Sequence, residues 1–311
     1  MKDKQLLPRF SDGNSFLYLE HCKVERDANA VAAYMEDAKI PVPCASLSTL
    51  MLGPGTNISH AAVKVLADNG CQVIWCGEQG VRFYAQGFPD TKSAANTLKQ
   101  AFLQSIPELR LKVIRKMYTM RFFEDLPEGL TLQQIRGKEG ARVRDNYAYW
   151  SRKTNIPWKG RNYKLNDWDI SDNINKALSW ANSCLYGVVQ AGIVSLGYSP
   201  ALGFIHIGKQ LSFVYDIADL YKTEITVPIA FTTVSEGPTK IEPVIRKRCR
   251  EMFKEKRLLE QIVKDIDIIM SAADKDIPKL TEPLDGESMG MLWNGFANFT
   301  VGGRNWGDVD K

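Results

Sequence analysis

Three side chains in the second half of the chain have the chemistry of a divalent-metal site. Asp216 and Asp219 are three residues apart, so a helix would place both carboxylates on one face. Two like charges on an otherwise apolar segment are unfavourable unless a cation or basic groups compensate for them. His206 lies ten residues before Asp216, in a short stretch bounded by glycines, and could add one nitrogen ligand. This donor set is typical of Mg²⁺ or Mn²⁺ sites, although a solvated pair of acids on a helix gives the same pattern.

Glu139 is a further candidate ligand, because it stands alone among bases. Its neighbours in the sequence include Arg136, Arg142 and Arg144, and glycines precede and follow it. Each glycine inside a helix costs about 1 kcal/mol relative to alanine, so the close approach of another helix or of a ligand would explain them. Glu139 is therefore either the ion-pair partner of these bases or a metal ligand surrounded by phosphate-binding arginines.

The segment from Trp158 to Lys164 interleaves aromatic and basic residues. Such a mixture can stack on nucleotides and neutralise phosphates, and a surface loop anchored by aromatic side chains has the same composition. Other kinds of site are missing from the sequence. It contains no phosphate-binding loop of the ATPases, no dinucleotide-binding glycine motif after a strand and no nucleophile elbow. ATPase, dehydrogenase and serine-hydrolase functions are therefore poorly supported.

The elements that must position these residues fall into two blocks. Strand-forming runs separated by turn signals are expected at 15–20, 31–35, 47–52, 71–76 and 81–85, and Pro41 and Pro43 confine any strand between them to a sheet edge. One helix interrupts this block, with Ser59 as its N-cap and Gly70 at its end.

Helices dominate after residue 90. They are expected at 93–106, at 109–123, from a capping box at Thr131 and Gln134 through 149, at 174–192, at 213–222, and as one charged helix from 243 to 270. The sequence therefore predicts a β-rich domain over 1–90, an all-helical domain over 91–280 and a flexible tail over 281–311 that is rich in glycine and aromatic residues.

Composition is that of an ordinary folded protein of 311 residues, with 44% hydrophobic and 24% charged residues. No apolar run approaches the roughly 18 residues that span a bilayer, and the first residues do not resemble a secretory signal. Six scattered cysteines without a Cys-x-x-Cys pair speak against structural zinc and disulfides. We therefore expect reduced, mostly buried thiols in a cytoplasmic protein.

Positive charge is concentrated although the net charge is only +4. Residues 110–164 hold 14 basic and 5 acidic residues, and residues 240–257 hold 8 basic and 3 acidic residues. Residues 260–311 are instead acidic, with 10 acids and 5 bases. Clustered Lys and Arg indicate a polyanionic partner, since neutralised phosphates release counterions, but a solvated helix face is the alternative.

Three segments together resemble the CRISPR-associated integrase, the catalytic subunit of the complex that acquires new spacers, in its type I-E-like branch. They are Arg136-Gly-x-Glu139-Gly-x-Arg142-Val-Arg144, Gly203-Phe-x-His206-x-Gly-Lys209 and Leu211-Ser-Phe-Val-Tyr-Asp216-Ile-Ala-Asp219. The likeness extends over roughly residues 15 to 260. It implies an α+β multidomain fold, with a small N-terminal β-sandwich-like domain followed by a larger all-α catalytic domain.

The resemblance also implies the activity. The protein would be a divalent-metal-dependent DNA integrase/endonuclease that joins the 3′-hydroxyl ends of captured foreign DNA to the CRISPR repeat by transesterification. Glu139, His206 and Asp219 would bind Mg²⁺ or Mn²⁺, with Asp216 beside them as a fourth catalytic residue. The chain would form a homodimer, and two dimers would flank a small dimeric CRISPR adaptation subunit with a ferredoxin fold, in a four-to-two complex.

DNA contacts are expected from bases and aromatic residues around this site. The candidates are Arg82, Arg136, Arg142, Arg144, Arg161, Tyr163, Trp168, Lys209, Tyr215, Lys222, Arg246 and Arg250. His21 occupies the position at which related proteins carry a tyrosine that wedges the end of the duplex, and imidazole stacks less strongly. Asn57 stands where relatives often have an arginine, and the tail from Thr281 has no clear match.

Two other functions use the same residues. An architectural DNA-binding subunit would keep the basic surface without catalysis, and it gives no physical reason to set acids beside that surface. A metal-dependent nuclease for branched DNA would use the same site with water in place of the 3′-hydroxyl as the nucleophile. The products, ligated strands or nicks, would distinguish the two enzymes.

Overall fold

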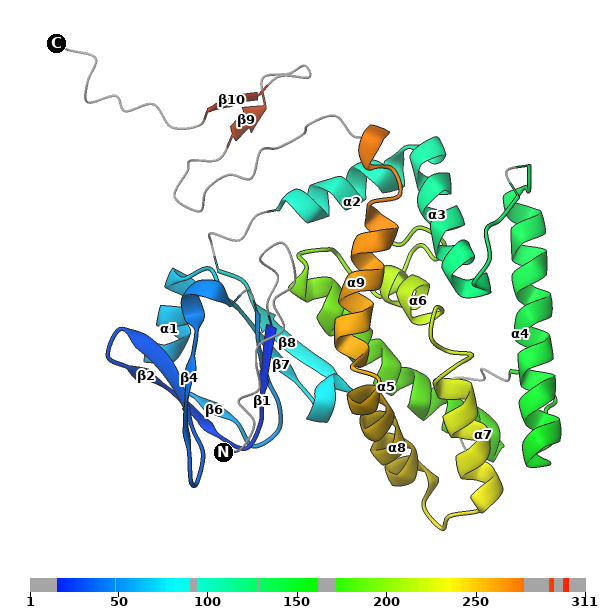
Figure 1. The fold of residues 1–311 in the computed structure, drawn as a ribbon, viewed down its shortest axis with the longest axis horizontal. Coiled ribbons are helices and arrows are strands. Elements are labelled where there is room, and N and C mark those ends of the chain that lie inside the picture. Colours follow the sequence, from blue (N-terminus) through cyan, green and yellow to red (C-terminus); the bar gives the residue numbers. More distant parts are fainter. Residues whose placement is uncertain are drawn as a thin grey trace.

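A computed structural model describes residues 16–47, 49–89, 94–127, 129–161, 172–276, 291–293 and 299–301. A region of β-sheets lies at one side of the molecule and a larger region of helices at the other (Figure 1). Tyr163 and Trp168, two of the predicted DNA contacts, and most of the tail predicted over 281–311 fall outside the described residues.

Two four-stranded sheets form the N-terminal region. The first has the order β1-β5-β7-β8, from Phe16–Leu19, Thr49–Leu52, Gln72–Cys76 and Phe83–Gly87. The second has the order β4-β3-β2-β6, from Lys39–Val42, Ala30–Tyr34, Lys23–Asp27 and Asn57–Ile58. Val24 and Leu50, from different sheets, belong to one buried cluster that also contains Leu66 of helix α1 (His60–Asp68). A β-sandwich-like arrangement is therefore confirmed.

The helix cap and the edge strand predicted for this region are both confirmed. Ser59 caps α1, because its hydroxyl accepts a hydrogen bond from the Ala62 amide at 3.2 Å. Pro41 lies in β4, and β4 is an edge strand. The sequence did not indicate β2 or β6, because the Lys23–Asp27 run is mostly charged and Asn57–Ile58 contains only two residues.

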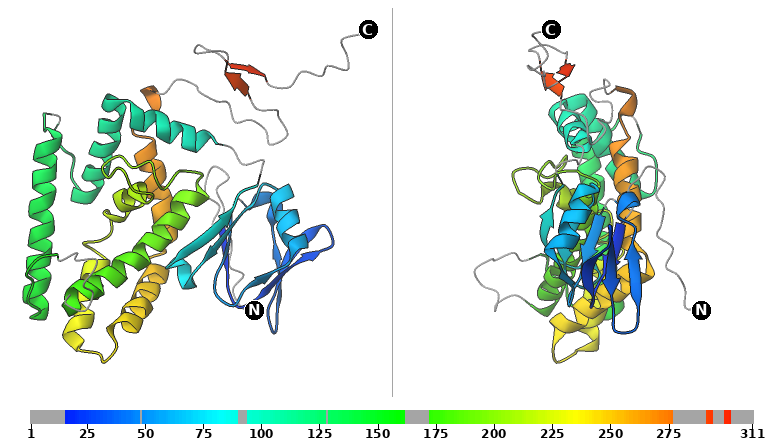
Figure 2. Two further views of the ribbon diagram at one scale, coloured as in Figure 1. Left: turned by 180° about the vertical axis from the view of Figure 1, so that it is seen from behind. Right: turned by 90° about the vertical axis from the view of Figure 1, so that its left-hand side faces the viewer.

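Helix α5 (Asn173–Ser195) runs through the centre of the helical region and is buried on most of its surface. Around it are α2 (Ala95–Ser105), α3 (Pro107–Phe122), α4 (Leu132–Thr154), α6 (Ser212–Ala218), α7 (Thr226–Glu236), α8 (Ile241–Glu255) and α9 (Leu258–Met270). Figure 2 shows that α5 and α8 lie next to the sheets, whereas α4 lies at the far edge of the molecule. Gly187 permits the contact of α5 with the sheet region, since a Cβ there would lie 2.5 Å from the Val81 carbonyl carbon.

Two helix predictions were wrong. The helix expected over 243–270 is divided into α8 and α9, because Arg257 adopts a left-handed conformation with φ 49° at the end of a charged run. The helix expected over 213–222 ends at Ala218, and a series of turns leads from there to α7. Asp216 lies within α6 and Asp219 directly follows its last residue, where the Asp219 amide still donates to the Tyr215 carbonyl at 3.1 Å, so the two acids keep their helical spacing.

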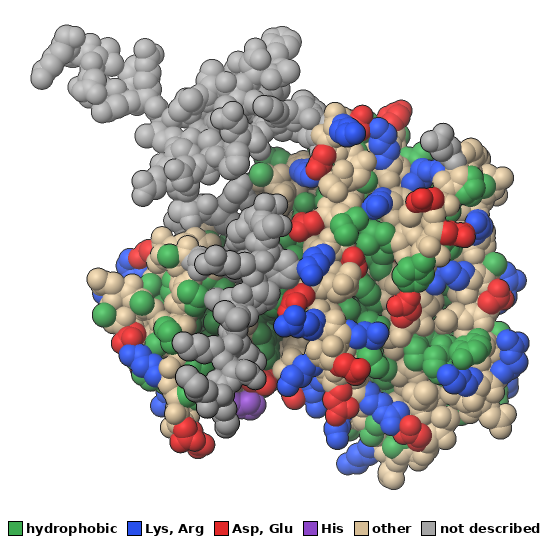
Figure 3. All heavy atoms as spheres, viewed as in Figure 1, with side chains coloured by type: hydrophobic (Ala, Val, Ile, Leu, Met, Phe, Trp, Pro, Cys, Tyr) green, Lys and Arg blue, Asp and Glu red, His purple; other side chains and the backbone are tan. Residues whose placement is uncertain are grey.

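The cysteines and the surface agree with the expectations from composition. All six cysteines are free and buried. Within the described ranges, no helix is long and apolar enough to cross a membrane. Lys and Arg side chains gather on the helical region where it borders the sheets, with acids interspersed (Figure 3). In the tail, Met291–Trp293 and Phe299–Val301 pair as two antiparallel strands, which the sequence did not indicate.

Candidate active site

Helix α4 carries Glu139 and begins at the predicted capping box. The Thr131 hydroxyl accepts a hydrogen bond from the Gln134 amide at 3.2 Å, and the Gln134 side chain accepts one from the Thr131 amide at 2.8 Å. Gly137 and Gly140 do not serve the close approach of a helix. A Cβ at either position would have no described atom within 4 Å, so packing within the described part of the chain does not explain either glycine.

Asp216 is fully buried and holds the loop that carries His206. Its two oxygens accept backbone hydrogen bonds from Phe204 at 2.6 Å, Ile205 at 3.0 Å and His206 at 2.9 Å. Oδ1 also lies 2.7 Å from the Nδ1 atom of the His206 ring. The turn requires Gly203, because a Cβ there would lie 2.2 Å from the His206 carbonyl oxygen. Asp216 therefore has the geometry of a positioning residue for His206, rather than of a metal ligand.

Asp219 and Glu139 come from distant parts of the chain and meet at one guanidinium. Arg121 Nη2 lies 3.4 Å from Asp219 Oδ2, and Arg121 Nη1 lies 3.6 Å from Glu139 Oε1. The other oxygen of each acid has its own cation: Lys222 Nζ is 2.7 Å from Asp219 Oδ1, and Arg142 Nε is 3.2 Å from Glu139 Oε2. Three cations therefore neutralise two partly buried carboxylates.

The electrostatics of Asp219 follow from these neighbours. Burial favours the neutral acid and would raise its pKa, but the charges of Lys222 and Arg121, with a smaller contribution from His206, outweigh burial and hold the pKa below its usual value. The Asp219 carboxylate in turn outweighs the burial of Lys222 and raises the pKa of that ammonium group. Both groups are therefore charged over the whole physiological range of pH.

Aromatic rings form one wall of the site. Lys222 Nζ lies 5.0 Å from the centre of the Tyr186 ring, and Tyr186 packs edge to face on Tyr215 at 5.1 Å. Tyr215 in turn packs on the His206 ring at 5.9 Å. The predicted residues Lys222, Tyr215 and His206 are thus brought together.

Sequence reasoning missed two residues of this site, Arg121 and Tyr186. Arg121 follows Ile114, Met117 and Tyr118 at helical spacing in α3, so a charge in an apolar stripe was the available signal. Tyr186 stands out in the same way, as a ring with a polar hydroxyl in the apolar helix α5. Neither pattern indicates which carboxylate or ring the side chain meets.

The donor types fit a divalent ion, and Arg121 lies between two of them. Two carboxylates and one imidazole are ligands that Mg²⁺ and Mn²⁺ accept. With Nδ1 against Asp216, the other ring nitrogen of His206 is left for a ligand, and 43% of this side chain is exposed. Among the described residues, no three His, Cys, Asp or Glu side chains are close enough together to hold an ion. An ion would therefore need the two acids to turn partly away from Arg121.

The predicted DNA contacts are distributed unevenly. Four are exposed, namely Arg82, Arg136, Arg144 and Lys209, although Arg136 also bonds to the Tyr118 side chain. Arg142 also reaches the Thr223 hydroxyl at 3.3 Å. Three are engaged by the protein: Arg161 with the Asn175 carbonyl at 3.0 Å, Arg246 with Glu242, and Arg250 with Glu78 at 3.1 Å. Arg161 thus anchors the start of α5.

His21 lies in the sheet region, at the turn after β1. It is exposed and has a left-handed φ of 51°, and its amide donates to the Pro54 carbonyl at 2.9 Å. Its ring fits against Gly55, where a Cβ would lie 2.5 Å from Nδ1. The turn therefore presents the imidazole at the surface.

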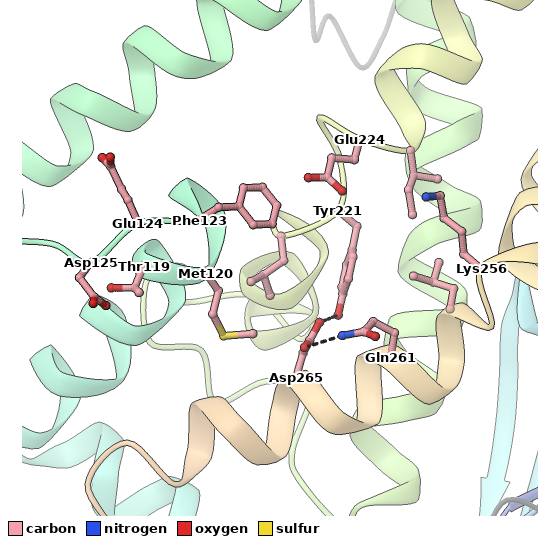
Figure 4. Close-up of a pocket in the computed structure, with 13 residues that line it drawn as sticks. Thr119, Met120, Phe123, Glu124, Asp125, Tyr221, Glu224, Lys256, Gln261 and Asp265 are labelled. Carbon is pink, nitrogen blue, oxygen red and sulfur yellow. Dashed lines mark hydrogen bonds between the residues drawn. The ribbon is translucent and has the colours of Figure 1, made fainter.

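A cavity of about 610 Å³ lies beside the site (Figure 4). It is lined by the end of α3, the turns after α6 and the start of α9, and none of the predicted ligands lines it. Asp265 is buried at its wall, where it accepts hydrogen bonds from the Tyr221 hydroxyl at 2.6 Å and the Gln261 amide at 2.8 Å. Burial raises the pKa of Asp265, although these two hydrogen bonds oppose the shift.

Comparisons with known proteins place these residues in a family. The family profile described as CRISPR associated protein Cas1 matches residues 119–243. The CRISPR-associated endonuclease Cas1 2 of Thermus thermophilus is 50% identical over 290 residues, which are 93% of this chain and 89% of that protein. The CRISPR-associated endonuclease Cas1 of Geobacter sulfurreducens is 42% identical over 268 residues, 86% of this chain and 88% of that protein. A crystal structure of a TtCas1–DNA complex superposes with a TM-score of 0.80 at 53% identity, covering 85% of this chain and 99% of that one.

Proposed function

Since this chain belongs to the CRISPR-associated Cas1 family, we propose that it is a divalent-metal-dependent DNA integrase/endonuclease of CRISPR adaptation, which joins the 3′-hydroxyl ends of captured DNA to the CRISPR repeat. The observation that carries the proposal is the meeting of Glu139 and Asp219 at Arg121, with a further cation on each acid and with His206 held by Asp216. Acids gathered at a basic surface serve metal-assisted chemistry on phosphates, whereas they would only weaken passive DNA binding.

Glu139, Asp219 and His206 would hold the ion, which polarises the scissile phosphate and stabilises charge on the attacking and leaving oxygens. The protein's own contribution is orientation. The Asp216 carboxylate favours the tautomer in which His206 Nδ1 donates a hydrogen bond to it, and in that neutral ring Nε2 carries the lone pair that would bind the ion. The buried carboxylate also fixes the backbone of the loop through three amides, and this limits the positions that the ring can adopt.

The reaction needs no nucleophile from the protein. The 3′-hydroxyl of the captured strand would form a new phosphodiester bond at the repeat phosphorus, and the repeat strand would leave with its own 3′-hydroxyl. Arg142 and Lys222 are about one quarter exposed, so they can turn from their acids towards phosphate oxygens. Exposed Lys209 and Arg144 would hold DNA farther from the reacting phosphate.

The assembly and the setting are part of the proposal. A homodimer, two copies of which flank a small dimeric adaptation subunit of ferredoxin fold, would bring two such sites to the two ends of one duplex. The type I-E-like branch stays a prediction, since the names of the matched relatives carry no subtype. The six free, buried thiols would remain reduced in the cytoplasm, where we expect the protein to act.

Two alternatives remain distinguishable. An architectural subunit would bind DNA without transferring strands, and the acids Glu139 and Asp219 would serve no purpose in it. A nuclease for branched DNA would use water at the same site and leave nicks. The integrase is favoured because arginine and lysine neighbours can hold a DNA strand, and with it a 3′-hydroxyl, at the acids.

A strand-transfer assay tests the proposal. A labelled duplex of about 30 base pairs, roughly three helical turns, is incubated with supercoiled plasmid carrying the cognate repeat, the small partner subunit and Mn²⁺. We expect label in the plasmid with wild type and a loss of at least about 100-fold with Glu139→Ala or Asp219→Ala. Glu124→Ala is the matched control, because it removes an exposed carboxylate from the neighbouring loop. DNA binding without transfer by wild type would support the architectural subunit, and nicks alone would support the nuclease.

A further inference from the structure

Arg121 is buried inside the candidate site, in the last turn of α3. Only 3% of its side chain is exposed, and its two terminal nitrogens face Glu139 Oε1 at 3.6 Å and Asp219 Oδ2 at 3.4 Å. Both distances exceed the usual hydrogen-bond length, so the interaction is mainly electrostatic. The guanidinium thus lies between the two predicted acidic ligands and faces one oxygen of each.

Other contacts hold Arg121 there independently of the acids. Its Nη2 atom donates a hydrogen bond to the backbone carbonyl of Asp216 at 3.0 Å, and its guanidinium carbon lies 5.0 Å from the centre of the Tyr118 ring. Its Nε atom is buried and has no acceptor among the described residues. A buried charge that lacks a full set of partners contributes little to stability by itself, so stability alone does not explain this residue.

The other two cations of the site differ from Arg121 in freedom. Arg142 and Lys222 have 26% and 24% of their side chains exposed, and each contacts the oxygen of its acid that Arg121 does not face. Both side chains reach the surface, where DNA phosphates would compete for their charges, whereas Arg121 is enclosed. Arg142 Nη2 is nevertheless buried and, like Arg121 Nε, has no acceptor among the described residues. If DNA engages Arg142 and Lys222, Arg121 is the cation that stays between Glu139 and Asp219.

We propose that Arg121 is a positioning residue that supplies a fixed positive charge between Glu139 and Asp219, holding the two carboxylates together until a divalent ion binds them. The inference rests on the proposed function, because it concerns the same acids. Without Arg121, Lys222 and Arg142 would each still contact one acid, but no positive charge would lie between Glu139 Oε1 and Asp219 Oδ2, and these two oxygens would repel each other. A divalent ion would then replace the missing charge, so a protein without Arg121 would depend on the ion for part of its stability.

The first test compares melting temperatures of the full chain in EDTA and in Mn²⁺. In EDTA, Arg121→Gln is expected to melt about 5 °C below wild type. In Mn²⁺, the difference in melting temperature between the two proteins should be at most half as large. Arg115→Gln is the matched control on the same helix, since the Arg115 guanidinium donates to the backbone carbonyls of Leu126, Pro127 and Leu130, outside the loop that carries His206. Its loss should be equal in both solutions. An equal loss for Arg121→Gln in both solutions would overturn the proposal.

The second test needs no metal and therefore separates this inference from the proposed function. In EDTA, the loss caused by Arg121→Gln is measured again in a Glu139→Gln background, where the repulsion is gone. We expect the loss to shrink by about half, and an unchanged loss would refute the positioning role. If Arg121→Gln does not fold, Arg121→Lys replaces it, with a smaller coupling of the same sign. Absence of any Mn²⁺ effect on wild type would count against the metal site, while this cycle would still decide the role of Arg121.

Discussion

Asp219 and Asp265 are both taken out of bulk solvent near the turns that follow α6, but their carboxyl groups have opposite kinds of partner. Asp219 lies among the cations Lys222 and Arg121, which hold its pKa below the usual value. Asp265 lies among neutral donors, Tyr221 and Gln261, and burial raises its pKa. Residues of the two clusters alternate along the chain, since Tyr221 lies between Asp219 and Lys222.

The difference separates a site that is ready for chemistry from one that is part of the packing. A carboxylate kept charged by movable cations can exchange them for a metal ion or for the phosphates of a substrate. Asp265 is held instead by two neutral hydrogen bonds, and the charge of Lys264 has a smaller effect on it than they do. The same turn can therefore serve catalysis with one set of side chains and stability with the other.

The largest expected effect comes from Asp216, which holds the His206 loop beside the cluster of Asp219. Asp216→Ala removes four interactions of the carboxylate and leaves the amides of Phe204, Ile205 and His206 without an acceptor. We expect the free energy of unfolding to fall by about 3–5 kcal/mol and strand transfer to be lost. Urea unfolding followed by circular dichroism measures the stability.

His206→Ala is the matched control for that prediction. It should abolish strand transfer while changing the free energy of unfolding by less than about 1 kcal/mol, because the His206 ring is exposed and its backbone amide still binds Asp216. If both variants lose the same stability, Asp216 does not act by holding the loop, and its positioning role is wrong.

Thr131 tests how strongly the catalytic cluster depends on its helix. Thr131→Ala removes the hydroxyl that caps α4 two turns before Glu139, and we expect a loss of about 1 kcal/mol in the free energy of unfolding. Thr131→Ser keeps the hydroxyl and should retain most of that stability. A loss of strand transfer with Thr131→Ala but unchanged stability would mean that the cap serves the position of Glu139 rather than the helix.

Local features of this molecule could be predicted from the sequence because their causes are local. The caps at Ser59 and Thr131 depend on residues at most three positions apart, and both are present. The change from strands to helices near residue 90 follows from periodicity alone. The ligand types were also apparent, since Glu139, His206 and Asp219 stand out chemically in their own segments.

Relations between distant segments could not be predicted in the same way. Helical spacing put Asp216 and Asp219 on one face, but the Gly203 turn directs three amides at Asp216 and ends the similarity between the two acids. The break at Arg257 could not be predicted because the charged run around it would also suit a continuous helix. Arg121 was visible only as a charge in an apolar stripe.

Asp265 gives the smallest effect and the clearest way to break the comparison. Because the pKa of Asp265 is raised, the folded protein binds a proton at this group more readily than the unfolded chain does. Its contribution to the free energy of unfolding is therefore fully present below pH 3.8, the ordinary pKa, and is lost as pH rises through the pKa of the folded protein. Asp265→Asn keeps a neutral side chain of the same shape. We expect it to be more stable than wild type by about 1 kcal/mol or less at pH 7, with the difference vanishing as pH falls towards 4.

Asp219→Asn should show the opposite dependence, because the pKa of Asp219 is lowered. The contribution of the Asp219 carboxylate to the free energy of unfolding is present above pH 3.8 and is lost as pH falls through its lower pKa in the folded protein. Wild type should therefore be more stable than Asp219→Asn at neutral pH and lose that advantage only in acid. Urea unfolding from pH 3 to pH 7 compares the two variants directly. If both differences from wild type change with pH in the same direction, the two carboxylates are neutralised alike, and the distinction between an exchangeable cluster and a packed one fails.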